Sequence, residues 1–143
     1  MLQPVVIDGI RTPIGKLNGA MKDIQPEEIA AFLLQKICER SHLDIRLLDA
    51  VILGQAKQSS DQPNIARLAA LMTKFPLEVQ AYTVHRQCGS GMQAVQNAAQ
   101  EIMCGYADFV LAGGIESMSN AQYYLREARR GYAVGNGILL DPN

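Results

Sequence analysis

The chain has 143 residues, of which 48% are hydrophobic, with a formal net charge of -1 and no tryptophan. This composition is typical of a globular protein with one domain, and a domain of this size buries roughly two thirds of the surface of its unfolded chain. The near-neutral charge argues against nucleic acid as a partner, and no apolar run approaches the roughly 18 residues of a membrane span. The start of the chain lacks the order of a signal peptide, so we expect a cytoplasmic protein.

Short apolar runs recur along the chain, and none of them alternates between apolar and polar residues. Unbroken runs of this kind are typical of strands that are buried on both faces of a parallel sheet. The runs are PVVIDG (4–9), AVILG (50–54), AYTVH (81–85) and DFVLAGG (108–114). The sequence therefore predicts a mostly parallel sheet.

Stretches with helical periodicity separate these runs. Pro26 is placed to begin the first helix, Asn64 to cap the second and Gly105 to end the third. The predicted apolar stripes are Ile29, Leu33 and Ile37; Ile65, Leu68 and Met72 or Leu71; and Met92, Val95, Ala99 and Ile102. The predicted order is β-α-β-α-β-α-β, an α/β fold.

After Ser119 this regular pattern is lost. Residues 120–143 hold aromatic, arginine and glycine residues without a sustained period. We therefore predict one domain over residues 1–119 and the start of an inserted loop region over residues 120–143.

The stretch RQCGSGMQA, residues 86–94, follows the third predicted strand and opens the third predicted helix, where ligands collect in doubly wound sheets. One interpretation is a dinucleotide site, because Gly89, Gly91 and Ala94 match the pattern G-x-G-x-x-A between a strand and a helix. Glu116 would then accept a hydrogen bond from the ribose. That fingerprint normally follows the first strand of such a unit, whereas two strand and helix steps precede it here.

A second interpretation makes Cys88 a nucleophile. Cys88 stands where a strand ends and a helix begins, so backbone N–H groups and the positive end of the helix dipole favour a negative charge on its sulfur. Gly89 and Gly91 leave room around the sulfur for a bulky acyl thioester, and Ser90 is suited to cap the helix. This interpretation explains more of the same residues than the dinucleotide site does.

A thiol nucleophile needs a base, and the histidines of the chain are His42 and His85. Strand alternation sends the side chains of His85 and Cys88 to opposite faces, so we expect His85 to be packed or hydrogen-bonded and not to act as the base. Cys38 and Cys104 lie near the carboxyl ends of predicted helices, and both are predicted to pack as small apolar side chains. Three cysteines without C-x-x-C spacing predict neither a disulfide framework nor a metal site.

The motifs of the chain resemble those of the amino-terminal half of the thiolases, enzymes that join or split acyl groups through coenzyme A. They are RTPIGKLNGA (11–20), NIAR (64–67), TVHRQCGSGMQAV (83–95) and ADFVLAGGIESMS (107–119). They occur in the right order along nearly the whole chain, and the cysteine loop and GGIESMS are highly specific. The resemblance implies a thiolase of the acetyl-CoA C-acetyltransferase type and an incomplete thiolase-like half-domain.

This resemblance implies that Cys88 is the catalytic, acyl-accepting cysteine and that its own N–H helps to hold the thioester oxyanion. The substrates would be coenzyme A thioesters: acetyl-CoA condenses with acetyl-CoA to give acetoacetyl-CoA and coenzyme A, with thiolysis as the reverse. It implies no bound cofactor and no metal. It also implies a homo-oligomer, or association with the missing carboxy-terminal half.

The sequence also departs from the thiolase pattern. Thiolases are longer chains of two similar halves, and the second half carries the basic histidine and a second active-site cysteine. This chain has no GHP-type histidine motif, no C-x-G-G-G segment and no final strand for its sheet, and His85 stands where asparagine is commoner. We therefore expect the 143-residue chain to be inactive by itself, and a non-catalytic fragment or an interaction module stays open as an alternative.

Overall fold

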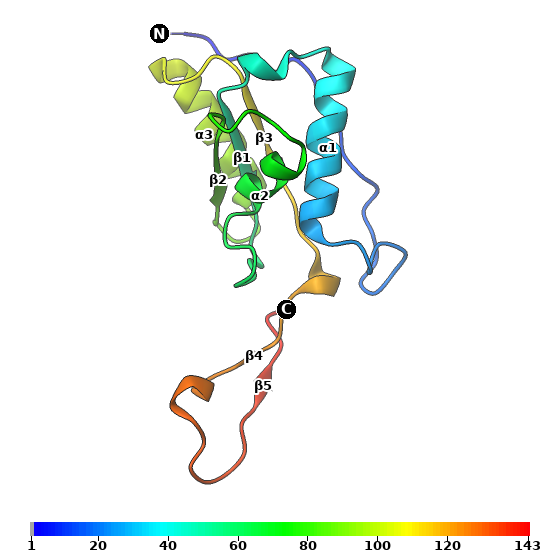
Figure 1. The fold of residues 1–143 in the computed structure, drawn as a ribbon, viewed down its shortest axis with the longest axis vertical. Coiled ribbons are helices and arrows are strands. Elements are labelled where there is room, and N and C mark those ends of the chain that lie inside the picture. The colour runs from blue at the N-terminus through cyan, green and yellow to red at the C-terminus, as the bar shows by residue number, and fades with distance from the viewer. Residues whose placement is uncertain (1) are drawn as a thin grey trace.

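The computed structural model of the protein describes residues 2–143. Helices and strands alternate along most of the chain (Figure 1). They are α1 (Pro26–Ser41), β1 (Ala50–Gly54), α2 (Ile65–Met72), β2 (Gln80–Val84), α3 (Ser90–Cys104) and β3 (Val110–Gly114). Short 3-10 helices, η1 (Ile45–Leu47), η2 (Met118–Asn120) and η3 (Ala128–Arg130), lie in the connections.

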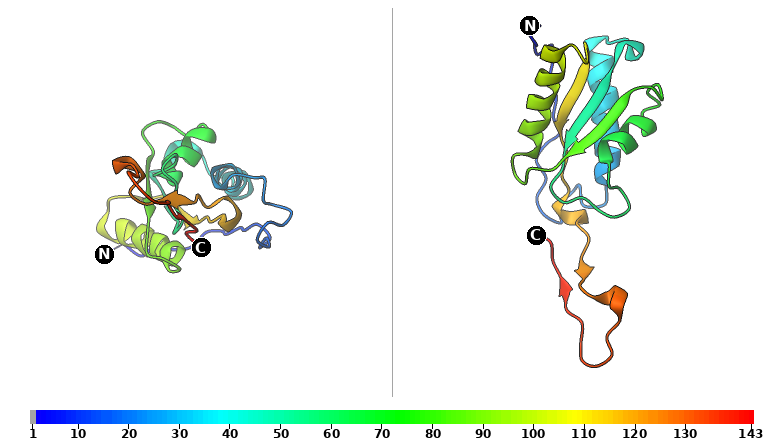
Figure 2. Two further views of the ribbon diagram at one scale, coloured as in Figure 1. Left: turned by 90° about the horizontal axis from the view of Figure 1, so that it is seen from below. Right: turned by 90° about the vertical axis from the view of Figure 1, so that its left-hand side faces the viewer.

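The strands form one parallel sheet in the order β2-β1-β3, with α1 and α2 on one face and α3 on the other (Figure 2). The core is therefore divided between the two faces of β1. Val51 and Leu53 point toward α1 and α2, while Ile52 packs against Ala94 and Ala98 of α3. This three-layer arrangement confirms the predicted α/β class and the parallel sheet.

The burial of the strands depends on their place in the sheet. Every residue of the central strand β1 is buried, as predicted for a strand covered on both faces. The outer strands β2 and β3 are only partly buried, so the prediction of complete burial is wrong for them. Each outer strand has a neighbour on one side alone, and its free edge remains open.

The first predicted strand, residues 4–9, is not part of the sheet. This segment has neither helix nor strand, and its apolar side chains are exposed, Val6 by 87%. It runs as extended chain outside the sheet, where an ion pair of 3.0 Å between Asp8 and Arg40 ties it to α1 (Figure 1). A run of apolar residues becomes a strand only where another strand supplies backbone partners, and no strand of the described chain pairs with this segment. The observed order is thus α-β-α-β-α-β.

The helix boundaries agree with the signals in the sequence. Pro26 is the first residue of α1, and the side chain of Asn64 accepts a hydrogen bond of 3.1 Å from the N–H of Arg67 to cap α2. Gly105 ends α3 with a φ of 75°, a left-handed conformation that suits glycine.

The predicted apolar stripes are wrong for α2 and α3, because alanines form most of the buried faces. In α3 the buried residues are Ser90, Ala94 and Ala98, whereas Met92 and Val95 are exposed. In α2 Ile65 is buried as expected, together with Ala66, Ala69 and Ala70. Small residues let each helix lie close to the sheet, so the largest apolar residues of a helix do not mark the face that packs.

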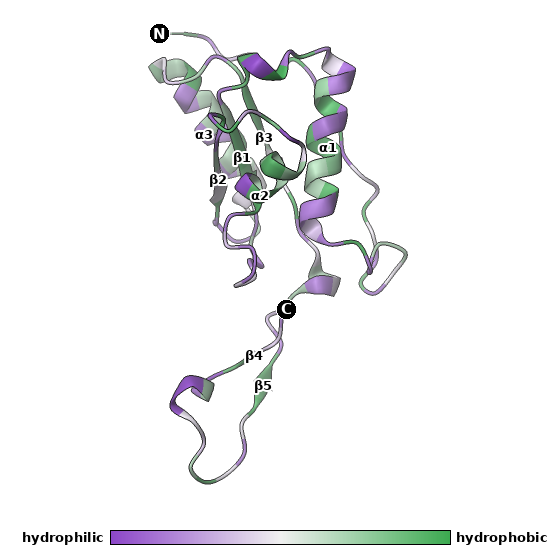
Figure 3. Cartoon of the chain, in the orientation of Figure 1, coloured by the Kyte–Doolittle hydropathy of each residue, from purple (hydrophilic) through white to green (hydrophobic). Residues whose placement is uncertain are grey.

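Residues beyond η2 leave the sheet and form a separate arm. There, β4 (Tyr124–Leu125) pairs with β5 (Leu139–Leu140) in antiparallel fashion, and the arm extends away from the sheet (Figure 1). Several of its hydrophobic residues face solvent, among them Val134 and Leu139 (Figure 3). The domain division after residue 119 stays a prediction.

Candidate functional site

The carboxyl ends of the parallel strands lie in one layer of the sheet. Gly54 at the end of β1 stands opposite Val84 of β2 and Gly114 of β3. The segments that follow these strands therefore lie at the same edge, which is where ligands collect in open parallel sheets. The loop that holds Cys88 is the segment after β2.

Glu116 connects two of these segments. Its carboxylate accepts hydrogen bonds from the N–H groups of Ala56 at 2.8 Å and Lys57 at 3.1 Å, so it ties the loop after β1 to the loop after β3. In the dinucleotide interpretation, this side chain would accept a hydrogen bond from the ribose. Because its oxygens already serve backbone N–H groups, the structure does not favour the dinucleotide interpretation.

A tight turn presents Cys88 at this edge. The N–H of Gly89 donates to the carbonyl of Arg86 at 3.0 Å, and the N–H of Ser90 donates to the carbonyl of Gln87 at 3.1 Å. Gln87 has a φ of 49°, in the left-handed region that residues with a Cβ rarely adopt. Cys88 is exposed at the outside of this turn, immediately before α3. The residue type does not predict this left-handed conformation, because glutamine is not enriched in the left-handed region.

Ser90 does not cap α3, contrary to expectation. Gly89 is the capping residue and Ser90 is the first residue of the helix. The Ser90 hydroxyl turns back into the loop, where it accepts a hydrogen bond of 2.8 Å from the N–H of Arg86 and donates one of 2.6 Å to the carbonyl of Gln87. Ser90 is thus part of the turn that carries Cys88.

The glycines around the cysteine serve packing more than substrate access. A Cβ on Gly54 would lie 2.2 Å from the carbonyl carbon of Ser90, so the start of α3 rests directly on the end of β1. Gly91, which was expected to leave room for a thioester, faces the end of β3 instead: a Cβ there would lie 3.7 Å from the Cα of Gly114. Only Gly89 adjoins the turn itself, near the carbonyl of Arg86.

The other cysteines and His85 differ in part from expectation. Cys38 is buried on α1, as predicted, and burial raises the pKa of its thiol. Cys104 is exposed at the end of α3, so its prediction as a packed apolar residue is wrong. His85 is exposed and has no hydrogen-bond partner within residues 2–143, so its predicted packing or hydrogen bonding is also wrong. No hydrogen bond joins the Cys88 thiol to a side-chain base in the described chain.

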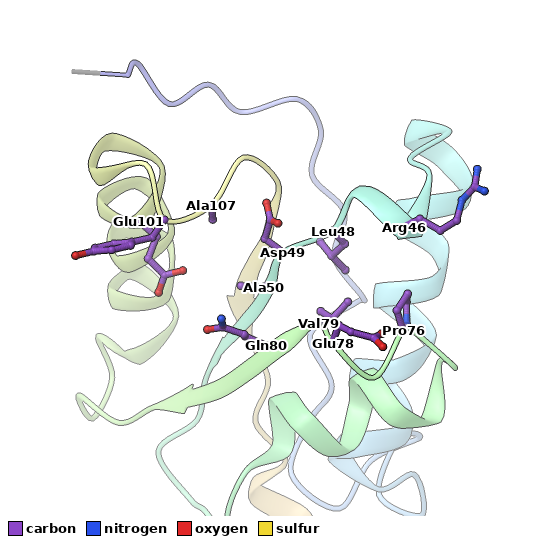
Figure 4. Close-up of a pocket in the computed structure, with 11 residues that line it drawn as sticks. Arg46, Leu48, Asp49, Ala50, Pro76, Glu78, Val79, Gln80, Glu101 and Ala107 are labelled. Carbon is purple, nitrogen blue, oxygen red and sulfur yellow. The ribbon is translucent and has the colours of Figure 1, made fainter.

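A hollow of about 730 Å³ lies at the opposite edge of the sheet, at the amino ends of β1 and β2 (Figure 4). One of its three acidic residues, Asp49, accepts hydrogen bonds from the N–H groups of Asp108 at 2.7 Å and Phe109 at 3.0 Å, and so fastens β1 to the turn before β3. It holds neither cysteine nor histidine. Cys88 and this hollow are therefore at opposite ends of the sheet.

No group of three or more histidine, cysteine, aspartate or glutamate residues within residues 2–143 is arranged to hold a metal ion. None of the described helices is long and apolar enough to cross a membrane.

Comparison with known proteins identifies the family of the chain. The family model described as "Thiolase, N-terminal domain" matches residues 4–142. The chain belongs to the thiolase family. This confirms the family that the motifs predicted, and with it an enzyme family of the acyltransferase kind.

Relatives of this thiolase chain are similar to it along nearly its whole length. It is 40% identical over 141 residues to a probable acetyl-CoA acyltransferase of Staphylococcus epidermidis. This match covers 99% of the chain and 36% of that protein. It is 39% identical over 135 residues to the 3-oxoadipyl-CoA/3-oxo-5,6-dehydrosuberyl-CoA thiolase of Escherichia coli. This second match covers 93% of the chain and 34% of that protein.

A solved structure has the same fold over the length of this chain. The crystal structure of the Bacillus anthracis acetyl-CoA acetyltransferase matches with a TM-score of 0.95 at 41% identity, over 99% of this chain and 36% of that one. The thiolase chain described here thus spans about a third of the length of these relatives.

Proposed function

We propose that this chain provides the acyl-accepting part of a thiolase and that Cys88 is the nucleophile. The observation that carries the proposal is the placement of Cys88: an exposed thiol on a tight turn, at the carboxyl edge of a parallel sheet and at the start of a long helix. Partial positive charge at the amino end of α3 favours the thiolate form that attacks a thioester. The family membership of the chain supports the same residue.

The proposed reaction has two steps. In the first, the Cys88 thiol loses its proton and its sulfur attacks the thioester carbon of acetyl-CoA. The bond between that carbon and the coenzyme A sulfur breaks, and the coenzyme A thiolate takes up that proton and leaves as the thiol. In the second, another acetyl-CoA loses a proton from its α-carbon to a base, and the carbanion attacks the acetyl group on Cys88. The Cys88 thiolate is expelled, the product is acetoacetyl-CoA, and thiolysis is the reverse.

The proposed reaction needs a hydrogen-bond donor to the thioester oxygen and a general base. The N–H of Cys88 is proposed to hold the oxygen of the thioester as negative charge develops on it. The second step needs a general base for a carbon acid, and in the described chain no side-chain base is hydrogen-bonded to the thiol. We therefore propose that the 143-residue chain accepts one acetyl group at Cys88 but does not turn over.

The surfaces of the sheet suggest the partner. β3 has a free edge, and the apolar side chains of Val5, Val6 and Ile7 are exposed. Exposed edges and apolar patches of this kind favour association. We propose that the chain self-associates or joins a carboxy-terminal thiolase half, and sedimentation as a stable monomer at high concentration would contradict this.

The test of the function is intact mass spectrometry of the chain after exposure to acetyl-CoA, followed by peptide mapping. The expected result is a single acetyl group on Cys88, with no release of acetoacetyl-CoA. The Cys88→Ser variant should take up no acetyl group, whereas Cys104→Ser, which removes the other exposed thiol, should be acetylated as before. A folded chain that remains unmodified would contradict the proposal.

A further inference from the structure

Ser90 is a buried polar residue directly behind an exposed cysteine. Its side chain is 4% exposed, whereas Cys88, two positions earlier, faces solvent. Both hydrogen-bonding functions of the hydroxyl are used within the turn, by the N–H of Arg86 at 2.8 Å and the carbonyl of Gln87 at 2.6 Å. The hydroxyl therefore closes the turn from the inside, across the residue that bears the thiol.

The turn contains a strained residue, Gln87, whose conformation must be held by contacts with its surroundings. Gln87 adopts a φ of 49°, a conformation that is unfavourable for a residue with a Cβ. Strained residues of this kind persist only where the surrounding structure over-determines them. The contacts that hold Gln87 are the hydrogen bond from the Ser90 hydroxyl and the backbone hydrogen bond of 3.1 Å from the Ser90 N–H, both to the Gln87 carbonyl.

Ser90 is itself held by the sheet. The backbone of Ser90 and Gly91 packs so closely on Gly54 that a Cβ at Gly54 would lie 2.2 Å from the Ser90 carbonyl carbon and 2.4 Å from the Gly91 nitrogen. Gly114 at the end of β3 approaches Gly91 from the other strand. Ser90 is thus the rigid point from which the strained residue is held, and Cys88 lies between the two.

We propose that Ser90 is a positioning residue for Cys88: its hydroxyl holds Gln87 in the left-handed conformation and so fixes the direction of the thiol at the amino end of α3. The inference rests on the proposed function for the role of the thiol, but the arrangement itself does not depend on acyl transfer. Without the hydroxyl, Gln87 relaxes toward the common right-handed or extended region. Cys88 then turns away from the helix end.

The three cysteines of the chain make a test possible within a single molecule. The rate of alkylation by iodoacetamide is measured at each cysteine by peptide mapping, as a function of pH, in the wild-type chain and in Ser90→Ala. Cys104 is exposed at the far end of α3, so its alkylation rate is the control for the reactivity of the reagent. Cys38 is 6% exposed, so its alkylation rate rises only if the whole fold loosens. We expect the Cys88 rate to fall about threefold to tenfold, the effect of losing about one net hydrogen bond, and its pH profile to change. The other two rates should stay unchanged.

Two further variants separate positioning from general stability. Ser90→Thr keeps a hydroxyl and should restore most of the Cys88 rate. Ser41→Ala removes a serine hydroxyl that donates to a helix carbonyl at 2.7 Å at the other end of the molecule, and it should leave the Cys88 rate unchanged. Equal losses in Ser90→Ala and Ser90→Thr would show that the volume of the side chain matters and not its hydroxyl, and would overturn the inference.

Two other results would also overturn it: an unchanged Cys88 rate in Ser90→Ala, or a change that only accompanies exposure of Cys38. Failure of the proposed function has a different signature. In that case the wild-type chain takes no acetyl group from acetyl-CoA, while the alkylation of Cys88 still depends on the Ser90 hydroxyl.

Discussion

Residues 4–9 and residues 50–54 are similar in composition but have opposite structures. PVVIDG and AVILG are both short runs of aliphatic residues without alternation. The second run forms β1, in which Ile52 is 0% exposed, whereas the first forms no strand and leaves Ile7 71% exposed. Residues 50–54 have a strand on each side and helices over both faces, and residues 4–9 have neither.

The comparison shows that an apolar run gives a segment a tendency to form a strand but does not decide whether that segment enters the sheet. Backbone N–H and C=O groups need partners, and side chains need a surface that covers them. Both are supplied by segments distant in sequence, namely β2, β3 and the three helices for residues 50–54. The following predictions test how far the two runs differ in energy, from the largest expected effect to the smallest.

The largest difference is expected for isoleucine truncation. Ile52→Ala should lower the free energy of unfolding by about 2 to 5 kcal/mol, because it removes a fully buried side chain and leaves a cavity between β1 and α3. Ile7→Ala, the matched change in residues 4–9, should change it by less than about 0.5 kcal/mol. Urea denaturation followed by circular dichroism measures both, and equal losses would mean that residues 4–9 are packed in solution.

Glycine substitution is expected to give the next largest contrast. Gly54→Ala places a Cβ 2.2 Å from the backbone of Ser90, so α3 must move, at a cost of about 1 to 3 kcal/mol or more. Gly9→Ala is the control in residues 4–9, because a Cβ there meets nothing within 4 Å. Thermal melting of the two variants should show a large shift for the first alone, and similar melting temperatures would contradict the close packing of α3 on β1.

Asn64 tests the support that β1 receives from its neighbour β2. Its side chain caps α2 and donates a hydrogen bond of 3.0 Å to the carbonyl of Ala81, while Thr83 donates to it at 3.0 Å. Asn64→Ala should cost about 0.5 to 2 kcal/mol. Asn64→Asp keeps the capping oxygen but loses the donor to β2, so it should cost less. Hydrogen exchange should show reduced amide protection in β1 and β2 for both variants, more for alanine, and protection lost only in α2 would count against this link.

A smaller effect is expected for the ion pair that ties residues 4–9 to α1. Asp8→Asn removes the contact of 3.0 Å with Arg40, a partly exposed pair that should contribute no more than about 1 kcal/mol. Arg40→Gln should have a similar effect, and the double variant should lose little more than either single one. A denaturation cycle with strictly additive losses would show that the two groups do not interact in solution.

The smallest effect concerns the entry to β1 and depends on pH. Hydrogen bonds from the side chain and backbone of Arg46 lower the pKa of Asp44, just before η1, from its ordinary 3.8 to about 2. Since this folded pKa lies below the unfolded one, the contribution of Asp44 is fully present above about pH 4 and is lost as the pH falls toward 2. Asp44→Asn should flatten that part of the stability profile slightly, because the pair is exposed. An unchanged acid profile would show that the pair does not persist in solution.

Much of the fold was predictable from local signals. Pro26, Asn64 and Gly105 mark helix ends by chemistry that acts within a few residues, and the structure has these ends where expected. The buried helix faces were not predictable in this way. Periodicity selects large apolar residues such as Met92, while the structure buries Ala94, because the distance between α3 and the sheet decides which side chains fit.

The candidate site shows the same division. The residue types and order around Cys88 were sufficient to indicate the thiolase family, which the family match confirms, while the role of Cys88 as nucleophile stays a proposal. The left-handed Gln87, the inward Ser90 hydroxyl and the backbone clamp of Glu116 were not predicted. Each depends on contacts made after the strands have come together, and a single residue type does not indicate such contacts.

The sequence by itself therefore determined the α/β class, the helix ends and the thiolase family, because each depends on residue types and their short-range spacing. Tertiary structure alone decided which apolar run entered the sheet, which helix faces were buried and how the cysteine turn is held. These depend on partners that are distant in the chain. Close packing of α3 against Gly54 brings the Ser90 hydroxyl under the turn that carries Cys88.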